Sequence, residues 1–176
     1  AGYPTAADWP AFHRGGPLLG ATTAPDAPRP PLKVRWTYCI DSAGVTGGPA
    51  AVGRSVYVAD DSGQVHSIDL ATGRRRWLYK AEDGFSTVPL VAGGRVFVGD
   101  KGGYMHAIDA RTGDKLWVHD SGDPINSSPN LDPRGRIVFA NDGGRVSCLA
   151  PDDGKPAWTA DLKQQTNGSV AVADGV

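Results

Sequence analysis

The chain has 176 residues, with eighteen basic and nineteen acidic side chains and a formal net charge of −1 at neutral pH. That length fits one domain. The balanced charge argues against the broad basic surface that nucleic acid or an anionic membrane would need. The chain contains 24 Gly and 14 Pro, and Glu82 is its only Glu. This composition favours turns over helices, so we expect a turn-rich β fold without a nucleic-acid partner.

The two cysteines, Cys39 and Cys148, lie far apart in the sequence and have no CxxC or Cys/His cluster around them. Neither a disulfide framework nor a zinc site is therefore indicated. No run of apolar residues approaches the length of a membrane span, so none is expected. The chain opens with neither Met nor an apolar signal core, which indicates a mature or excised segment.

In chain order, the first predicted unit is an extended lead-in segment over residues 1–31. Its last part, 25–31 (PDAPRPP), is too rich in proline to pair as a strand. The next segment, 32–40 (LKVRWTYCI), has the character of an outermost strand in a repeated sheet. The repeats are therefore predicted to begin at residue 32 and to continue to residue 176.

The tryptophans reveal an internal repeat. Four of the five Trp follow one period, with spacings of 41, 40 and 41 residues: Trp36, Trp77, Trp117 and Trp158. Alignment on them brings three segments into register: 67–77 (SIDLATGRRRW), 107–117 (AIDARTGDKLW) and 148–158 (CLAPDDGKPAW). The chain therefore contains three related units of about forty residues.

Each unit is predicted to form four short strands. In the second unit these are 86–92, 95–100, 104–109 and 115–119, with Gly-rich turns between them. One such antiparallel sheet cannot hide both faces alone, and radial stacking of its copies makes a propeller. We therefore predict an all-β fold: a β-propeller of four-stranded antiparallel blades, with about three complete blades in a partial ring.

The residues that recur in every unit are interpreted as structural. A large indole at one place in each blade is best explained as a wedge between neighbouring sheets. Asp69 and Asp109 each precede a Thr-Gly pair and are expected to close a turn rather than to catalyse. The same turn contains Gly73, Gly113 and Gly154. In the third unit Ala150 replaces the Asp and Asp153 the Thr, so a looser turn is expected there.

No catalytic, metal or cofactor-binding residue is predicted. His66 and His106 occupy one slot in two units, and equivalent positions in adjacent blades are too far apart to share a metal ion. They are interpreted as half-buried strand histidines. The stretches 60–63 (DDSG) and 141–144 (NDGG) lack the spaced oxygens of an EF-hand and are interpreted as hairpin turns.

The run D-x-x-T-G-x-x-x-W at 69–77 and 109–117 resembles the tryptophan-docking motif of the PQQ-like (pyrroloquinoline-quinone repeat) propeller family. Residues 8–20 (DWPAFHRGGPLLG) resemble the lead-in of its secreted members. WD40 and kelch repeats fit less well in motif and period. Enzymes of the family hold PQQ over the ring axis with calcium, a catalytic Asp and typically two adjacent cysteines. This sequence has no Cys-Cys pair, and the calcium ligands cannot be mapped onto it.

The resemblance therefore implies the blade but not the active site. We expect small neutral residues to line a wet axial channel instead: Thr46, Ser86, Thr87, Asn126, Ser127, Ser128, Asn167 and Ser169.

Two functions remain open. The first is a non-enzymatic scaffold or protein-interaction module of the bacterial cell envelope, similar to the propeller lipoprotein of the outer-membrane β-barrel assembly machinery. Loops around Gly84, Asp123 and Gln164 would present its binding face to a protein partner. The second is a fragment of a PQQ-dependent alcohol or sugar dehydrogenase, which would need PQQ and calcium. The family resemblance implies a location in the periplasm or at the cell surface.

The ends of the repeat predict an open ring. Segment 32–40 lacks three preceding strands, and 167–173 is an innermost-type strand without the two strands that should follow it. Three blades and two unpaired strands cannot close a ring. We therefore expect an N-terminal fragment of a larger propeller, an open arc with exposed apolar edges and a tendency to associate.

Overall fold

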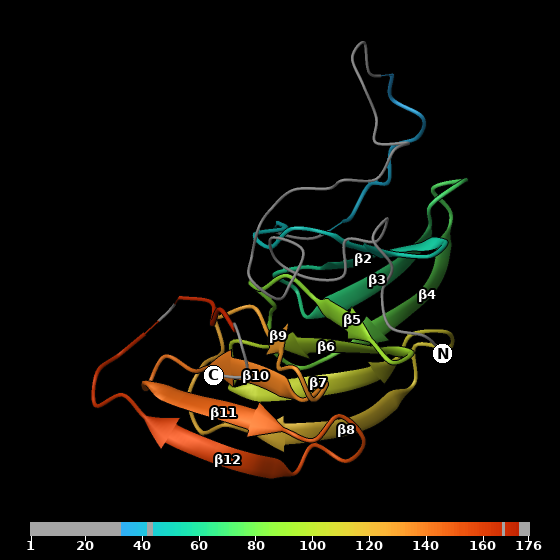
Figure 1. Ribbon diagram of the computed structural model, residues 1–176. Helices are drawn as coiled ribbons and strands as arrows, with labels where there is room; N and C mark the ends of the chain where they lie inside the picture. Colours follow the sequence, from blue (N-terminus) through green and yellow to red (C-terminus); the bar gives the residue numbers. More distant parts are fainter. Residues whose placement is uncertain (1–32, 42–43, 167, 173–176) are drawn as a thin grey trace.

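The computed structural model describes residues 33–41, 44–166 and 168–172, and its regular structure consists of strands (Figure 1). The strands form three separate four-stranded antiparallel sheets, which we call blades 1, 2 and 3. Blade 1 contains β1 (Ala50–Val52), β2 (Ser55–Ala59), β3 (Gln64–Asp69) and β4 (Arg75–Lys80). Blade 2 contains β5 (Leu90–Ala92), β6 (Arg95–Gly99), β7 (Tyr104–Asp109) and β8 (Lys115–Asp120). Blade 3 contains β9 (Asn130–Leu131), β10 (Ile137–Ala140), β11 (Arg145–Leu149) and β12 (Pro156–Asp161).

Every blade is a meander in which neighbours in sequence are neighbours in the sheet. The third strand of each blade shifts register against the fourth at an equivalent place, for example between Ser67 and Ile68 in blade 1 and between Ala107 and Ile108 in blade 2. Such a bulge bends the strand and increases its twist. The predicted all-β propeller with about three blades is confirmed.

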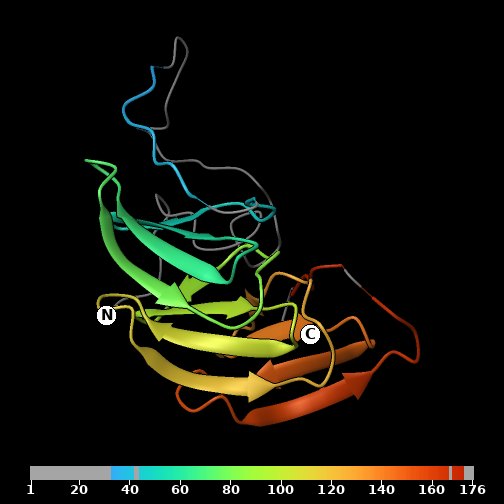
Figure 2. The same ribbon diagram turned by 180° about the vertical axis from the view of Figure 1, so that it is seen from behind.

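The hydrophobic core lies between the blades. Because side chains alternate along a strand, Val96 and Val98 of β6 join the cluster shared with blade 1, whereas Phe97 between them joins the cluster shared with blade 3. Figures 1 and 2 show from opposite sides that the three sheets follow one another in an arc, with the long outer strands β4, β8 and β12 on its periphery. Blade 2 is therefore covered on both faces.

The innermost strands are shorter than predicted. The expected strand 86–92 begins only at Leu90. Before it, the backbone N–H of Val88 donates to Ser128 Oγ of the next blade at 2.9 Å. This stretch reaches β6 through the side chain of Thr87, which donates to Gly99 O, and not through a regular backbone ladder. The other three predicted strands of this blade agree with β6, β7 and β8 to within one residue.

Neither segment that was predicted as an unpaired strand has strand structure. Residues 33–41 and 168–172 form no backbone ladder with any described strand. An isolated extended segment has no partner to satisfy its backbone groups, so a strand is not expected there without a neighbour. The lead-in predicted over 1–31 lies outside the described residues. Among the residues described, none forms a helix long and apolar enough to cross a membrane.

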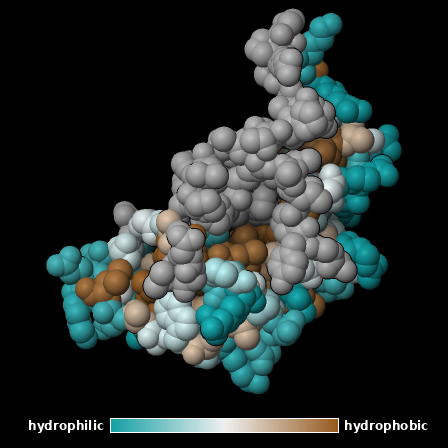
Figure 3. All heavy atoms as spheres, viewed as in Figure 1, coloured by the Kyte–Doolittle hydropathy of each residue, from teal (hydrophilic) through white to brown (hydrophobic). Residues whose placement is uncertain are grey.

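The last blade presents its outer face to solvent. Trp158 on β12 is 41% exposed, and Leu162 just beyond the strand is 52% exposed. Apolar (brown) atoms also reach the surface toward this end of the arc in Figure 3. The described sheets therefore form an open arc and not a closed ring.

Candidate functional site

The most elaborate side-chain chemistry lies at the contacts between blades, where each repeated tryptophan packs on the turn of the following blade. Trp77 of β4 donates its indole N–H to Ala110 O at 3.0 Å and lies on Gly113. Gly113 has φ +82°, and a Cβ there would sit 2.8 Å from the indole ring. Glycine is therefore required at this position for two reasons: its backbone conformation and the close approach of the indole ring. Two further tryptophans repeat the contact: Trp36 with Leu70 O and Gly73, and Trp117 with Pro151 O and Gly154.

The repeated aspartates hold the turn on which the indole rests. Asp109 accepts backbone N–H bonds from Arg111 at 2.8 Å and Thr112 at 2.9 Å. Asp69 is bonded in the same way and also pairs with Arg76. The bond from the Arg76 side chain, followed by those from Thr72 and the turn, lowers the pKa of Asp69 to about 2. A carboxylate with these bonds is a turn cap and has no general-acid function at neutral pH.

The third turn keeps its backbone without the carboxylate. Gly154 N donates to Ala150 O at 3.0 Å, as Gly113 N donates to Asp109 O at 2.9 Å. Asp153, at the position of the Thr, caps Lys155 N at 3.1 Å. The looser turn expected here is therefore a turn with the same backbone bonds and fewer side-chain caps.

A second set of contacts joins Tyr, His and Asp across the boundary between blades 1 and 2. Tyr79 of β4 shares a hydrogen bond of 2.9 Å between its hydroxyl and Nδ1 of His106 on β7. The other ring nitrogen, Nε2, lies 2.8 Å from Asp100 Oδ2. Both His106 and Asp100 are buried. Both ring nitrogens of His106 are therefore engaged, one with the tyrosine hydroxyl and the other with the carboxylate.

The same relay occurs one blade earlier. Tyr38 contacts His66 Nδ1 at 3.0 Å, and His66 Nε2 lies 3.1 Å from Asp60 Oδ2. Burial raises the pKa of Asp60, but the bonds from His66, Ser62 and Gln64 outweigh it and hold the pKa below its usual value. The histidines were predicted to be half-buried. They are buried more fully than that, and both ring nitrogens have partners.

At the boundary between blades 2 and 3 all three members of the relay are different. The equivalent residues are His119, Ser147 and Asn141. Asn141 still accepts the hairpin N–H bond, from Arg145 at 2.9 Å, as Asp100 does from Tyr104 at 2.7 Å. Burial lowers the pKa of His119. The hairpin cap is therefore common to all blades, whereas the relay belongs to the first two boundaries.

The relay has no vacant position for a substrate or a metal. A cavity of about 430 Å³ opens beside it, lined in part by Tyr79, Asp100 and His106. Both nitrogens of His106 are bonded within the relay, and burial, together with the nearby Asp100, raises the pKa of Tyr79. The phenol therefore stays protonated at neutral pH. Within the described residues, no group of three or more His, Cys, Asp or Glu side chains could hold a metal ion.

The small polar residues near the axis mostly bond to backbone and do not line a wet channel. Ser127 is fully buried and both donates to Ala140 O and accepts from Ala140 N. Thr87, also buried, donates to Gly99 O at 3.3 Å. Ser128 N in turn donates to Ser169 Oγ at 3.0 Å. The predicted channel lining is wrong for Thr87, Ser127 and Ser128, because their hydroxyls complete backbone bonding where the inner strands are short. Asn167 lies outside the described residues.

Two predicted axial residues join a small polar cluster. Ser86 Oγ donates to Asn126 Oδ1, and Asn126 Nδ2 donates to Asp142 Oδ2 at 2.7 Å. The other oxygen, Asp142 Oδ1, is buried and has no hydrogen-bond partner among the described residues. One carboxylate with one amide and one hydroxyl supplies fewer oxygens than the six to eight that calcium takes. The described residues thus do not by themselves fit a calcium-bound quinone. The remaining predicted axial residue, Thr46, bonds to Asp61.

Comparison with known proteins relates this architecture to one family. A family model described as "Outer membrane protein assembly factor BamB" matches residues 26–176. A search of curated proteins found no match.

Several solved structures share the fold. The chain is similar to BamB from Moraxella catarrhalis, with a TM-score of 0.66, 23% identity, and coverage of 74% of this chain and 41% of that one. It is also similar to a quinohemoprotein alcohol dehydrogenase from Comamonas testosteroni, with a TM-score of 0.74, 23% identity, and coverage of 87% and 27%. A computationally designed protein, Ika8, matches with a TM-score of 0.63 and 15% identity over 70% and 39%. The chain thus spans well under half the length of each of these structures.

Proposed function

The chain belongs to the PQQ-like propeller family whose model is described as the outer membrane protein assembly factor BamB, and on that premise we propose that it is a non-enzymatic scaffold or protein-interaction module. It would act in the bacterial cell envelope, in the periplasm or at the cell surface, and bind a protein partner. It would use no cofactor.

One observation carries this proposal: the buried His–Asp pairs and the repeated aspartates are bonded within the blades. Among the described carboxylates, Asp142 is the exception, because its Oδ1 is buried without a partner. The His–Asp pairs are saturated within the blades, and the repeated aspartates cap turns. Catalytic acids and bases need a proton that they can exchange with a substrate within hydrogen-bonding reach. Groups that are fully occupied in packing support an architectural role instead.

The dehydrogenase alternative has its own supporting observation. The chain superposes on the Comamonas testosteroni quinohemoprotein alcohol dehydrogenase with a higher TM-score, and over more of its length, than on BamB. At 23% identity this likeness concerns the fold alone. A PQQ site on this chain would also need calcium ligands beyond Asp142 and its neighbours.

A binding titration distinguishes the two functions. PQQ and Ca²⁺ are added to the chain, quenching of its tryptophan fluorescence is followed, and turnover of an alcohol or aldose is measured with an artificial electron acceptor. We expect no saturable quenching and no turnover, while a quinohemoprotein alcohol dehydrogenase run in parallel gives both. Saturable quenching with turnover would replace the scaffold by the dehydrogenase.

A second experiment tests the scaffold directly. A photo-crosslinking residue at Asp123, in a loop between blades 2 and 3, is expected to give a discrete protein adduct in the envelope fraction of the source cell. The same substitution at the buried Phe97 serves as the control and is expected to give none. Fractionation that recovers the protein only from the cytosol would contradict the proposed location.

A further inference from the structure

Charged side chains are segregated between the two ends of the strands, although the net charge of the chain is close to zero. In an antiparallel meander, the turns between first and second strands and between third and fourth strands lie at one end of the blade. The turns between second and third strands, and the connections between blades, lie at the other. We call the first end the hairpin face and the second the connection face.

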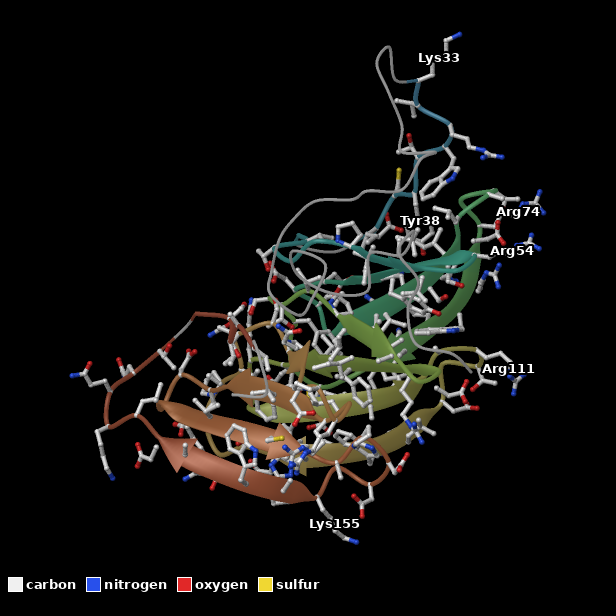
Figure 4. The ribbon with its side chains drawn as sticks, in the orientation of Figure 1. Lys33, Tyr38, Arg54, Arg74, Arg111 and Lys155 are labelled. Carbon is white, nitrogen blue, oxygen red and sulfur yellow. The ribbon has the colours of Figure 1, made fainter. Side chains whose placement is uncertain are left out.

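The hairpin face has an excess of unpaired cations. Within the described residues, Arg76, Arg95, Arg136 and Lys155 there form ion pairs with aspartates. Six more cations on this face make no ion pair within the described chain: Arg54, Arg74, Arg75, Arg111, Lys115 and Arg134. Figure 4 shows Arg54, Arg74 and Arg111 projecting from the same side of the molecule.

The connection face has the opposite character. Carboxylates without an ion pair in the described chain include Glu82, Asp83, Asp120 and Asp123. Lys101 and Lys163 on this face are paired with aspartates, and Lys80 and Arg145, also on this face, make no ion pair within the described chain. The near-zero net charge therefore results from two charged faces that cancel, and a charged partner would meet opposite fields at the two ends.

A cavity on the hairpin face gives the cations a concave centre. It has a volume of about 550 Å³, lies between blades 1 and 2, and includes Arg76, Arg95 and Arg111 in its lining. Arg76 and Arg95 are held by bonds to Asp69 and Asp152. The lining also contains Tyr57, whose hydroxyl bonds to Ala110 O at 3.2 Å. Two guanidinium groups are thus fixed at the rim. The guanidinium of Arg111 makes no ion pair within the described residues, although its charge helps to lower the pKa of Asp109, which also lines the cavity.

The chemistry of this face favours carboxylates. Arginine presents a planar fork of donors that matches a carboxylate in two parallel bonds. A single bond of this kind already crosses a blade boundary, where Arg95 Nη2 lies 2.7 Å from Asp152 Oδ1. Beside the cavity, Leu116 is 45% exposed and can cover the aliphatic stem of a glutamate. Asp152 is neutralised by Arg95, whereas Asp114 is exposed and makes no ion pair within the described residues. A narrow peptide segment can pass beside Asp114, but a flat anionic lipid surface would meet it.

We propose that the hairpin face, centred on the cavity between blades 1 and 2, binds an acidic peptide segment of a protein partner through Arg111 and the unpaired arginines around it. This inference rests on the proposed scaffold function. It adds a second contact surface, on the face opposite the loop of Asp123, and specifies the chemistry of the partner segment that this surface takes. The connection face, which is acidic, is excluded from that contact by like charge.

The test compares two variants of equal net charge. Arg54→Glu/Arg111→Glu reverses two unpaired cations on the hairpin face, and Lys80→Glu/Lys163→Glu reverses two on the connection face. The full chain and both variants are titrated with a short amidated peptide that has Glu at every second position, and with its Gln counterpart. Binding is measured by calorimetry at about 20 mM and about 300 mM salt, where the Debye length falls from about 20 Å to about 6 Å.

We expect the Glu peptide to bind and the Gln peptide not to bind, with affinity lost at the higher salt. The hairpin-face variant should weaken binding by about tenfold or more, and the connection-face variant should not weaken it. Equal effects of the two variants, or no binding of the Glu peptide, would overturn the inference. So would binding of phosphatidylglycerol vesicles without binding of the peptide.

Failure here is separable from failure of the scaffold function. If the Asp123 crosslink to a protein partner forms while the unmodified chain does not bind the Glu peptide, the inference is wrong and the scaffold stands. PQQ-dependent turnover by the unmodified chain would remove the scaffold function itself.

Discussion

Trp77 and Trp158 occupy the same position in the repeat and have opposite environments. Trp77 is 9% exposed, because Gly113 and Ala110 of blade 2 cover it. Trp158 is 41% exposed, and all of β12 around it is exposed, because no described blade follows blade 3. The burial of a repeated residue is therefore supplied by the next blade and not by its own. Four experiments test this contrast.

The largest difference is expected between two tryptophan substitutions. Trp77→Ala removes a buried wedge and should lower the free energy of unfolding by about 3–5 kcal/mol, the scale of large core truncations. Trp158→Ala removes a half-exposed ring and should cost about 1 kcal/mol or less. Urea unfolding followed by circular dichroism measures both. Equal losses would show that burial by the next blade is not what stabilises the position.

A methyl group at the docking turn tests the close approach itself. Gly113→Ala combines a positive φ, costing about 1–2 kcal/mol, with a Cβ placed 2.8 Å from the Trp77 ring, which adds about 1–3 kcal/mol. Gly53→Ala is the matched control, because Gly53 also has a positive φ but a Cβ there would meet nothing within 4 Å. Thermal unfolding should separate the two variants. If they lose the same stability, only the backbone conformation matters.

The Tyr–His–Asp relay should contribute less than the indole. Tyr79→Phe removes the hydroxyl at His106 Nδ1 and leaves a buried acceptor without its partner, which should cost about 1–2 kcal/mol. Tyr104→Phe, on an exposed tyrosine that lines the cavity beside the relay, should change stability by less than about 0.5 kcal/mol. Urea midpoints of the two variants are compared. If Tyr79→Phe leaves the urea midpoint unchanged, the relay does not contribute to holding the blades together.

The smallest effect concerns acid sensitivity of the turns. The pKa of Asp69 is lowered to about 2, first by Arg76, so the unfolded chain binds a proton there more readily. Its stabilisation is present above about pH 4 and is lost as the pH falls toward 2. Asp69→Asn should therefore reduce the loss of stability across this window. Asp109→Asn should reduce it less, because the bonds that lower the pKa of Asp109 come mainly from the turn itself.

Melting temperatures measured between neutral pH and the acid limit check this order. Ala150, at the equivalent position in blade 3, has no carboxylate and contributes nothing to this acid sensitivity. Asp153 in the same turn does contribute, because Lys155 lowers its pKa. If the melting temperature of Asp69→Asn falls with pH in parallel with that of the unmodified chain, Asp69 is not the source of the acid sensitivity.

The blades could be predicted from the sequence because the period of the tryptophans and the turn residues agree with one another. The residues that bond to His66 and His106 could not be predicted from any single position of the repeat. Aligned repeats contain the signal: where His66 and His106 become Ser147, the tyrosine slot becomes His119 and the aspartate slot becomes Asn141. Three positions that change together within one chain indicate a contact.

Two other features depend on tertiary placement and had no sequence signal of this kind. The hydroxyls of Thr87 and Ser127 resemble channel residues in sequence, but short inner strands leave backbone groups that these hydroxyls satisfy. The net charge of −1 gives no sign of the two charged faces, because a sum over all side chains does not record where each charge lies. The predicted tendency of the arc to associate stays a prediction.

The direction of the indole contact also has a consequence for synthesis on the ribosome. Trp36 rests on blade 1, Trp77 on blade 2 and Trp117 on blade 3, so every wedge waits for a blade translated after it. At about 5–20 residues per second, a blade of about forty residues emerges roughly every 2–8 s. During each interval the newest tryptophan remains exposed. The nascent chain then has one exposed apolar surface at its end, which its own next blade or a chaperone must cover.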